Sequence, residues 1–185
     1  NAPTGTINII GDIKQGAIIS AVTTLLSDAD GVGTLSYQWL ADGVAILNAT
    51  DDKYTLTQTE VGKSISLKVN YIDGLGNSEE VTSSSSSAVA NLNDLPVLIT
   101  ASSLTTNENT ASAAIAFSAS DVDGDTLTFT FSDPAKGSIT INNDGTYTYT
   151  PDANEIGSDS FTVTVNDGTV DVSQAVSVLI ASDLQ

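Results

Sequence analysis

The stretch Ser64-Ile65-Ser66-Leu67-Lys68-Val69-Asn70-Tyr71 alternates polar and apolar residues along its whole length. A period of two places successive side chains on opposite faces of a strand, so one face is buried and the other meets solvent. The same alternation returns in residues 126–131 and 160–165. Short Gly-, Asp- and Asn-rich turns separate such runs. The chain is therefore predicted to be all-β and antiparallel.

Each alternating run belongs to a unit that occurs twice, about 93 residues apart. The matching pairs are Asp28-Ala29-Asp30-Gly31 with Asp121-Val122-Asp123-Gly124, Thr34-Leu35-Ser36-Tyr37 with Thr126-Leu127-Thr128-Phe129, Tyr54-Thr55 with Tyr147-Thr148, Glu60-Val61-Gly62 with Glu155-Ile156-Gly157, and Asp73-Gly74 with Asp167-Gly168. We expect two tandem antiparallel Ig-like β-sandwiches, joined end to end, with about seven strands each and no substantial helix.

The boundary between the units is expected near residues 90–96. Pro96 cannot continue a sheet ladder, and the Asn and Asp residues before it favour turns. The predicted domains are residues 1–93 and 94–185. Five consecutive serines at 83–87 resemble a flexible linker, but they lie where the last strand of the first domain should run, so we expect a strand there.

Composition excludes several kinds of chemistry. The chain has no His and no Cys, and 23 acidic residues against 5 basic ones give a formal net charge of −18. Nucleophile pairs that need His or Cys, thiol redox sites and ordinary zinc or haem sites are excluded. A nucleic-acid partner is not expected, because phosphate binding depends on clustered cations. No apolar run approaches the ~18 residues of a membrane span, so no membrane insertion is expected; we also expect a monomer.

The strongest group of acidic residues is Asp28/Asp30 and its copy Asp121/Asp123/Asp125. Alternate carboxylates in an extended turn point the same way, and oxygen-rich loops suit Ca²⁺ above other cations. An EF-hand is excluded, because position 12 of the loop would be Trp39 or Ser132 rather than an acid. A polar hairpin turn without an ion is the alternative interpretation.

In such a sandwich the turns after the second and sixth strands lie at the same end. Asp73 is then expected near Asp28 and Asp30, and Asp167 near Asp121 and Asp123. The linker enters at that end of the second domain, and the turn that carries Glu60 faces the linker from the first domain. The Ca²⁺ ligands expected at the junction are Glu60, Asn91, Asn93, Asp94, Asp121, Asp123 and Asp167, and the matching group in the first domain is Asp28, Asp30 and Asp73.

Paired Asp residues also occur as acid–base pairs in aspartic proteases and glycosidases. Exposed turns offer no apolar pocket that would raise one pKa, so we expect no enzyme activity. Trp39, Tyr147 and Tyr149 could stack on a sugar, but Trp39 shares strand parity with Leu35 and Tyr37, which favours a core position.

Two stretches carry a resemblance to known repeats. Residues 3–95 resemble the Ig-like repeat of giant bacterial RTX-type surface adhesins, and the matching stretches are LSDADGVGTLSYQWLADGVAI at 26–46 and YTLTQTEVGKSISLKVNYIDGLGN at 54–77. The segments LTTNENT, ASDVDGDTLTFTF, GSITINNDGTYTYTP and GSDSFTVTVNDG of residues 96–181 resemble the bacterial cadherin-like repeat of the same kind of protein. The resemblance covers nearly the whole chain and implies a secreted, cell-surface array of sandwiches that Ca²⁺ stiffens at each junction.

Carried over by residue, the resemblance places the cadherin Asp-x-Asp at Asp121 and Asp123, the linker Asn-Asp at Asn93 and Asp94, and the late acid at Asp167. It also matches Glu108 to the first-strand acid of cadherins, which would face a following junction. The first domain lacks such a glutamate, so its contribution depends on Glu60. Asn91 stands where cadherins usually carry Asp.

Three functions are compatible with the sequence. The first is a Ca²⁺-stabilised extender in a surface adhesin, which spaces a distal binding domain from the cell in adhesion or biofilm formation. Its partners would be neighbouring repeats and host or biofilm surfaces. The second is a module that binds a glycan or peptide, and the third is a spacer in a secreted polysaccharide-degrading enzyme. Short loops and few aromatic residues (5%) favour the extender.

Overall fold

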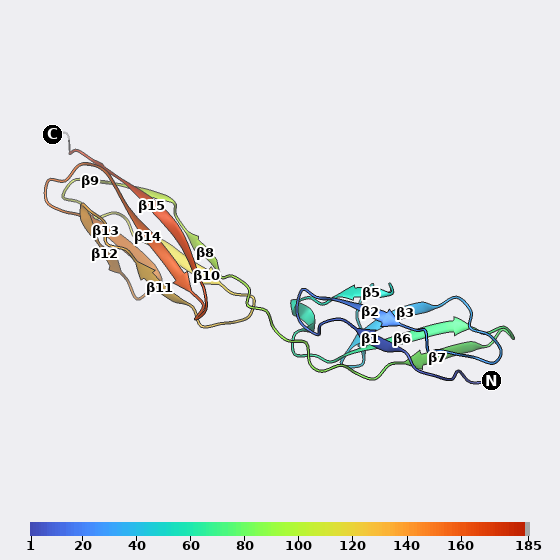
Figure 1. The fold of residues 1–185 in the computed structure, drawn as a ribbon. Coiled ribbons are helices and arrows are strands. Elements are labelled where there is room, and N and C mark those ends of the chain that lie inside the picture. Colours follow the sequence, from blue (N-terminus) through green and yellow to red (C-terminus); the bar gives the residue numbers. More distant parts are fainter. Residues whose placement is uncertain (184–185) are drawn as a thin grey trace. The chain divides into compact units, whose positions relative to one another are not determined.

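The computed structural model describes residues 1–183 and places the alternating run 64–71 in β6 (Ile65–Ile72). Contacts divide the chain into unit 1 (Asn1–Leu92) and unit 2, which begins at Asn93 (Figure 1). Each unit is a mainly antiparallel Ig-like sandwich of two sheets. The division falls within the linker that the sequence indicated.

Unit 1 has a three-stranded sheet in the order β1-β2-β5 and a four-stranded sheet in the order β4-β3-β6-β7. Its other strands are β1 (Asn8–Ile10), β2 (Ile18–Val22), β3 (Ser36–Ala41), β4 (Val44–Ala45), β5 (Lys53–Thr55) and β7 (Ser78–Thr82). A single 3₁₀ turn, η1 (Gln58–Glu60), precedes β6. Within residues 1–183, no helix is long and apolar enough to cross a membrane.

Unit 2 has two four-stranded sheets in the orders β12-β13-β10-β8 and β11-β14-β15-β9. Its strands are β8 (Val97–Thr100), β9 (Ser103–Asn107), β10 (Ile115–Ser120), β11 (Thr128–Phe131), β12 (Gly137–Ile141), β13 (Thr146–Pro151), β14 (Gly157–Asn166) and β15 (Asp171–Ala181). All pairs in unit 2 are antiparallel except β9 with β15, which run parallel.

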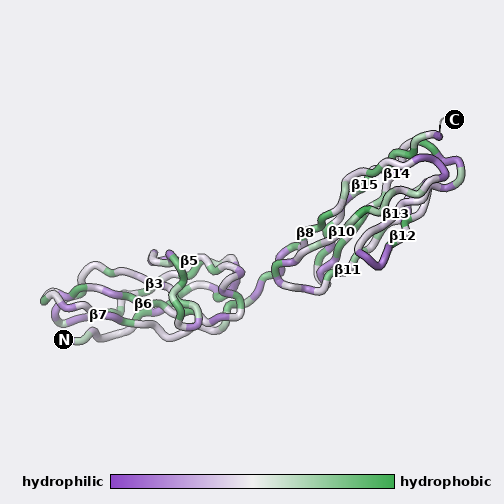
Figure 2. Tube along the Cα trace, turned by 180° about the vertical axis from the view of Figure 1, so that it is seen from behind, coloured by the Kyte–Doolittle hydropathy of each residue, from purple (hydrophilic) through white to green (hydrophobic). Residues whose placement is uncertain are grey.

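The predicted alternation is confirmed at the level of single side chains. In β6, Leu67, Val69 and Tyr71 are buried, and in β14 the odd positions from Phe161 to Val165 are buried. Both hydrophobic and hydrophilic segments occur along the strands of each unit (Figure 2). Burying one face of each sheet against the other is the dominant favourable term in folding.

The aromatic residues belong to the cores. Trp39 is fully buried in unit 1, and its Nε1 donates to the carbonyl of Asp51 at 2.9 Å. Tyr147 and Tyr149 are fully buried in unit 2, where both rings pack against Phe161. None of the three presents an exposed ring face to a sugar, which agrees with the core interpretation.

The strand predicted for the serine run 83–87 is wrong. β7 ends at Thr82, although the run still follows β6. Ser83 donates its N–H to the carbonyl of Leu67 and accepts the N–H of Leu67 on its hydroxyl, and Ser86 does the same with Ile65. Serine hydroxyls thus replace backbone carbonyls as acceptors, and the regular ladder stops because side chain and backbone compete.

Candidate metal centres

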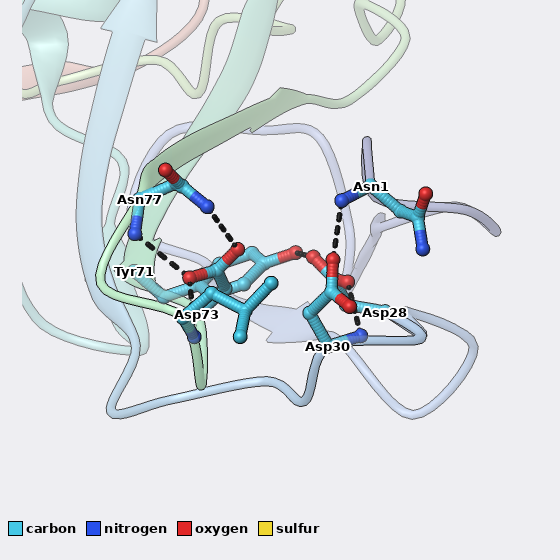
Figure 3. Close-up of polar contacts among 7 residues, drawn as sticks. Asn1, Asp28, Asp30, Tyr71, Asp73 and Asn77 are labelled. Atoms are coloured by element: carbon cyan, nitrogen blue, oxygen red, sulfur yellow. Dashed lines mark hydrogen bonds and ion pairs between the residues drawn. The ribbon is translucent and has the colours of Figure 1, made fainter.

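Cluster 1 lies at one end of unit 1 and comprises Asp28, Asp73 and Glu79 together with Asp30. Figure 3 shows the three aspartates of cluster 1 and their hydrogen-bond partners. Asp28 and Asp30 follow β2, and Asp73 directly follows β6. Within the first loop, Asp28 Oδ1 accepts the N–H of Asp30 at 2.9 Å. The two loops are joined by Gly74, which donates its N–H to the carbonyl of Asp30 at 2.9 Å. A Cβ on Gly74 would lie 2.2 Å from that carbonyl oxygen, so only glycine permits this approach.

Asp73 is buried and closes the turn between β6 and β7. Its Oδ1 accepts the N–H groups of Leu75 and Asn77 at 2.9 and 2.7 Å, and its Oδ2 accepts Nδ2 of Asn77 at 2.9 Å. These donors, with the Asn77 side chain the largest contributor, lower the pKa of Asp73 from its ordinary value. The carboxylate is therefore held ionised at the centre of cluster 1.

Tyr71 and the α-amino group of Asn1 supply the other donors of cluster 1. The Tyr71 hydroxyl donates to Asp28 Oδ2 at 2.8 Å, and the amino group donates to Asp30 Oδ2. Burial, followed by the bond to Asp28, raises the pKa of Tyr71 to about 12. Tyr71 therefore stays protonated and keeps donating throughout the ordinary pH range.

Sequence reasoning missed Glu79. One carboxylate oxygen each from Asp28, Asp73 and Glu79 lies within 4.8 Å of the other two, close enough to share a cation. The signal was the hairpin: a turn after Ile72 pairs Tyr71 with Glu79 across β6 and β7. Residues directly opposite each other in an antiparallel pair project from the same face, so Glu79 lies on the face that carries the Tyr71 side chain.

Cluster 2 comprises Asp121, Asp123, Asp125 and Asp167 and lies at one end of unit 2. The first three lie between β10 and β11, and Asp167 directly follows β14. Oxygens of Asp121, Asp123 and Asp125 lie within 4.8 Å of one another. Desolvation, followed by repulsion from the other three carboxylates, raises the pKa of Asp125. Cluster 2 thus concentrates negative charge beyond what its own hydrogen bonds offset.

The first two residues of unit 2 are held against cluster 2. Asn93 Nδ2 donates to Asp167 Oδ2 at 2.9 Å, and the N–H of Asp94 donates to Asp123 Oδ2 at 2.7 Å. The Asn93 bond is the largest cause of the lowered pKa of Asp167, followed by the N–H groups of Val170 and Thr169. The linker and the acidic loops therefore form one hydrogen-bonded group.

The two clusters are built alike at the repeat spacing. In each, the first Asp of the motif accepts the N–H of the second, Asp28 from Asp30 and Asp121 from Asp123. In each, a nitrogen of the incoming chain donates to Oδ2 of the second Asp: that of Asn1 to Asp30, and that of Asp94 to Asp123. The duplicated sequence thus specifies the same loop geometry twice.

One oxygen distinguishes cluster 2. Asp121 Oδ2 is buried and has no hydrogen-bond partner among residues 1–183. A buried carboxylate oxygen without a donor is costly, and a cation is one way to satisfy it. The oxygen donors of cluster 2, all carboxylates, fit the preference of Ca²⁺ for hard oxygen ligands.

Three further residues were predicted as metal ligands: Glu60, Asn91 and Glu108. Glu60 is buried in unit 1, where Oε2 accepts the N–H and hydroxyl of Thr57 at 2.9 and 2.7 Å as a capping box for η1. Asn91 is an exposed residue of unit 1. Glu108 follows β9, and its Oε1 accepts the N–H of Asp183 at 2.9 Å, at the opposite end of unit 2 from cluster 2. Metal ligation by any of these residues stays a prediction.

Comparison with known proteins gives a family match for unit 2. Residues 93–182 match the family model of the bacterial cadherin-like domain. That stretch contains cluster 2 and both residues that the incoming chain places against it. Domains of this family are typically extracellular and non-catalytic. No curated protein matches the chain.

Solved structures with some similarity include an endo-fucoidan hydrolase of glycoside hydrolase family 107 (15% identity, 99% of this chain and 29% of that chain, TM-score 0.37). Others are the fibronectin(III)-like modules of Clostridium thermocellum CbhA (16%, 96% and 95%, 0.34) and Drosophila N-cadherin EC1-3 (11%, 98% and 68%, 0.39). The chain spans less than a third of the hydrolase chain. At these TM-scores the similarities carry no argument about what the chain does.

Proposed function

We propose that the chain is a calcium-stabilised pair of extender repeats from a large bacterial surface adhesin of the RTX type, which spaces a distal binding domain from the cell. Support comes from the cadherin-like match of residues 93–182 and from the recurrence of an acidic cluster at the repeat spacing. The observation that carries the calcium part is the buried, partnerless Oδ2 of Asp121 among three further carboxylates.

Calcium would act on stability through binding to the folded state alone. A cation among Asp121, Asp123 and Asp125 turns their mutual repulsion into attraction, and the unfolded chain has no such arrangement. At a free Ca²⁺ concentration about 100-fold above Kd, the folded state gains roughly 2.7 kcal/mol. Asn93 and Asp94 are hydrogen-bonded to cluster 2, so the same ion would fix the linker to unit 2.

The test of calcium binding is thermal unfolding of the whole chain in Ca²⁺, in Mg²⁺ and in a chelator. We expect Tm to fall by several degrees when Ca²⁺ is removed, and Mg²⁺ to restore little of it, because Mg²⁺ demands a stricter geometry and dehydrates reluctantly. Asp121→Asn should remove most of the calcium response. Asp133→Asn, which removes the same charge at an exposed position outside cluster 2, should leave it intact.

The ligand-binding alternative can be tested on a glycan and peptide array. The hollow beside β1, about 250 Å³ in volume, is lined by Asn8, Ile9, Gly11, Ile13 and serines 84–87. None of these side chains offers an aromatic face for a sugar. We expect no strong array signal, and a reproducible hit would replace the extender proposal with a binding module.

A further inference from the structure

The two clusters share their loop geometry but differ in one donor. Asp28 Oδ2 receives the Tyr71 hydroxyl at 2.8 Å, whereas the matching oxygen of Asp121 has no partner among residues 1–183. Tyr71 stands two residues before Asp73, and Val165 stands two residues before Asp167. Both side chains are buried, but valine has no hydroxyl to donate.

This difference decides how each cluster is satisfied without an ion. A hydrogen bond to a charged acceptor offsets much of the cost of burying it, and an unsatisfied oxygen keeps the full cost. In cluster 1, Asp28 is satisfied by Tyr71, and Asp73 accepts three further donor groups. In cluster 2, Asp167 is satisfied in the same way, but Asp121 is left one donor short.

We propose that Tyr71 takes the place of a cation in cluster 1, so that unit 1 folds independently of calcium while unit 2 depends on it. The inference deepens the proposed function and rests on it. A cation entering cluster 1 must compete with the Tyr71 hydroxyl for Asp28 Oδ2, whereas the matching oxygen in cluster 2 is open to it. We therefore expect cluster 2 to bind calcium at least about tenfold more tightly than cluster 1.

The experiment follows each unit within the whole chain. Trp39 is the chain's single tryptophan and is fully buried in unit 1, so its fluorescence reports the unfolding of unit 1 alone. Hydrogen exchange of peptides from β14 reports unit 2. We expect the chelator to leave the Trp39 transition in place and to raise exchange in β14. Titration with Ca²⁺ alone should then protect β14 well before it changes Trp39.

The decisive variant is Tyr71→Phe, which removes only the hydroxyl. Asp28 Oδ2 then lacks its donor, as Asp121 Oδ2 does, and the Trp39 transition should become sensitive to chelator and recover in Ca²⁺. Adding Asp28→Asn to this variant should abolish the new sensitivity, because the unsatisfied charge is gone. Tyr37→Phe, which removes a hydroxyl from β3 of the same unit, is the matched control and should behave as the unsubstituted chain.

Several outcomes overturn the inference. If the chelator lowers both transitions equally in the unsubstituted chain, calcium binding stands and the role of Tyr71 fails. If Tyr71→Phe leaves Trp39 insensitive to calcium, the role of Tyr71 fails as well. If neither unit responds to calcium, the proposed calcium function itself fails. A chain lengthened by two residues before Asn1 replaces the amino group with an amide, and a calcium response of Trp39 in that chain would assign the effect to the amino group rather than to Tyr71.

Discussion

The ionised carboxylate of Asp125 is expected to have opposite effects on the stability of unit 2 in the absence and in the presence of a bound cation. Its pKa is raised, so its ionised form is disfavoured in the folded state, and at neutral pH the carboxylate destabilises unit 2. That destabilisation is present above its folded pKa and disappears as pH falls below the unfolded value. A cation in cluster 2 would reverse the sign of the contribution.

The substitution Asp125→Asn should therefore change sign with calcium. In chelator, removing one of four neighbouring negative charges should raise the melting temperature of unit 2 by a few degrees. In Ca²⁺ the same substitution should lower it, because a ligand is lost. Thermal unfolding monitored by hydrogen exchange in β14 measures the melting temperature of unit 2 in chelator and in Ca²⁺. The control Asp133→Asn should leave that temperature unchanged in both conditions. An effect of the same sign in both conditions would argue against a metal at Asp125.

Single residues also mark how far the sequence could be read. The Asp-x-Asp motifs and the acids after β6 and β14 were found, because repeat spacing and sandwich topology bring their turns together. Glu79 was missed because its place depends on strand register across the hairpin of β6 and β7, and a one-residue slip in register moves every side chain to the other face. The Tyr71–Asp28 bond was missed because it joins residues 43 positions apart in the sequence. The capping role of Glu60 is written locally in Thr57-Gln58-Thr59-Glu60, and that signal was available.

At the scale of elements, alternation predicted β6, β11 and β14, which form regular backbone ladders. The strand expected at residues 83–87 from its position in the domain did not form, because serine hydroxyls serve as acceptors there. The device recurs in unit 2: Ser112 exchanges the same two bonds with Tyr149, and Ser132 with Thr162. A serine can leave the regular strand while still satisfying both backbone groups of its neighbour, and no period-two pattern reveals that choice.

We expect Ser83→Ala and Ser86→Ala each to destabilise unit 1 by about 1–2 kcal/mol, because each leaves a backbone N–H of β6 without its acceptor. Chemical denaturation followed by Trp39 fluorescence measures the change. Ser84→Ala and Ser85→Ala, at exposed positions of the same run, are matched controls and should be close to neutral. Equal effects at all four positions would mean that the hydroxyls do not support β6.

At the scale of the whole molecule, the net charge of −18 is the property that calcium should change most visibly. One Ca²⁺ in cluster 2 would bring the formal charge to −16, since −18 plus 2 is −16. Native electrophoresis at rising Ca²⁺ should show anodal mobility falling at the concentrations that protect β14. The Asp121→Asn chain should not show this fall in mobility at those concentrations. A gradual fall identical in both chains would indicate diffuse screening rather than a site.

The parallel pairing of β9 with β15 has a mechanical consequence. When the two ends of unit 2 are pulled apart, the five residue pairs from Ser103–Ser177 to Asn107–Ala181 are loaded in shear and must rupture together. Unit 1 has only isolated parallel bridges, at Lys14–Ala90 and Val61–Val89, to resist the same tension. Under load, we therefore expect unit 1 to unfold before unit 2. Unfolding of unit 1 would release roughly 300 Å of extended chain while unit 2 stays folded.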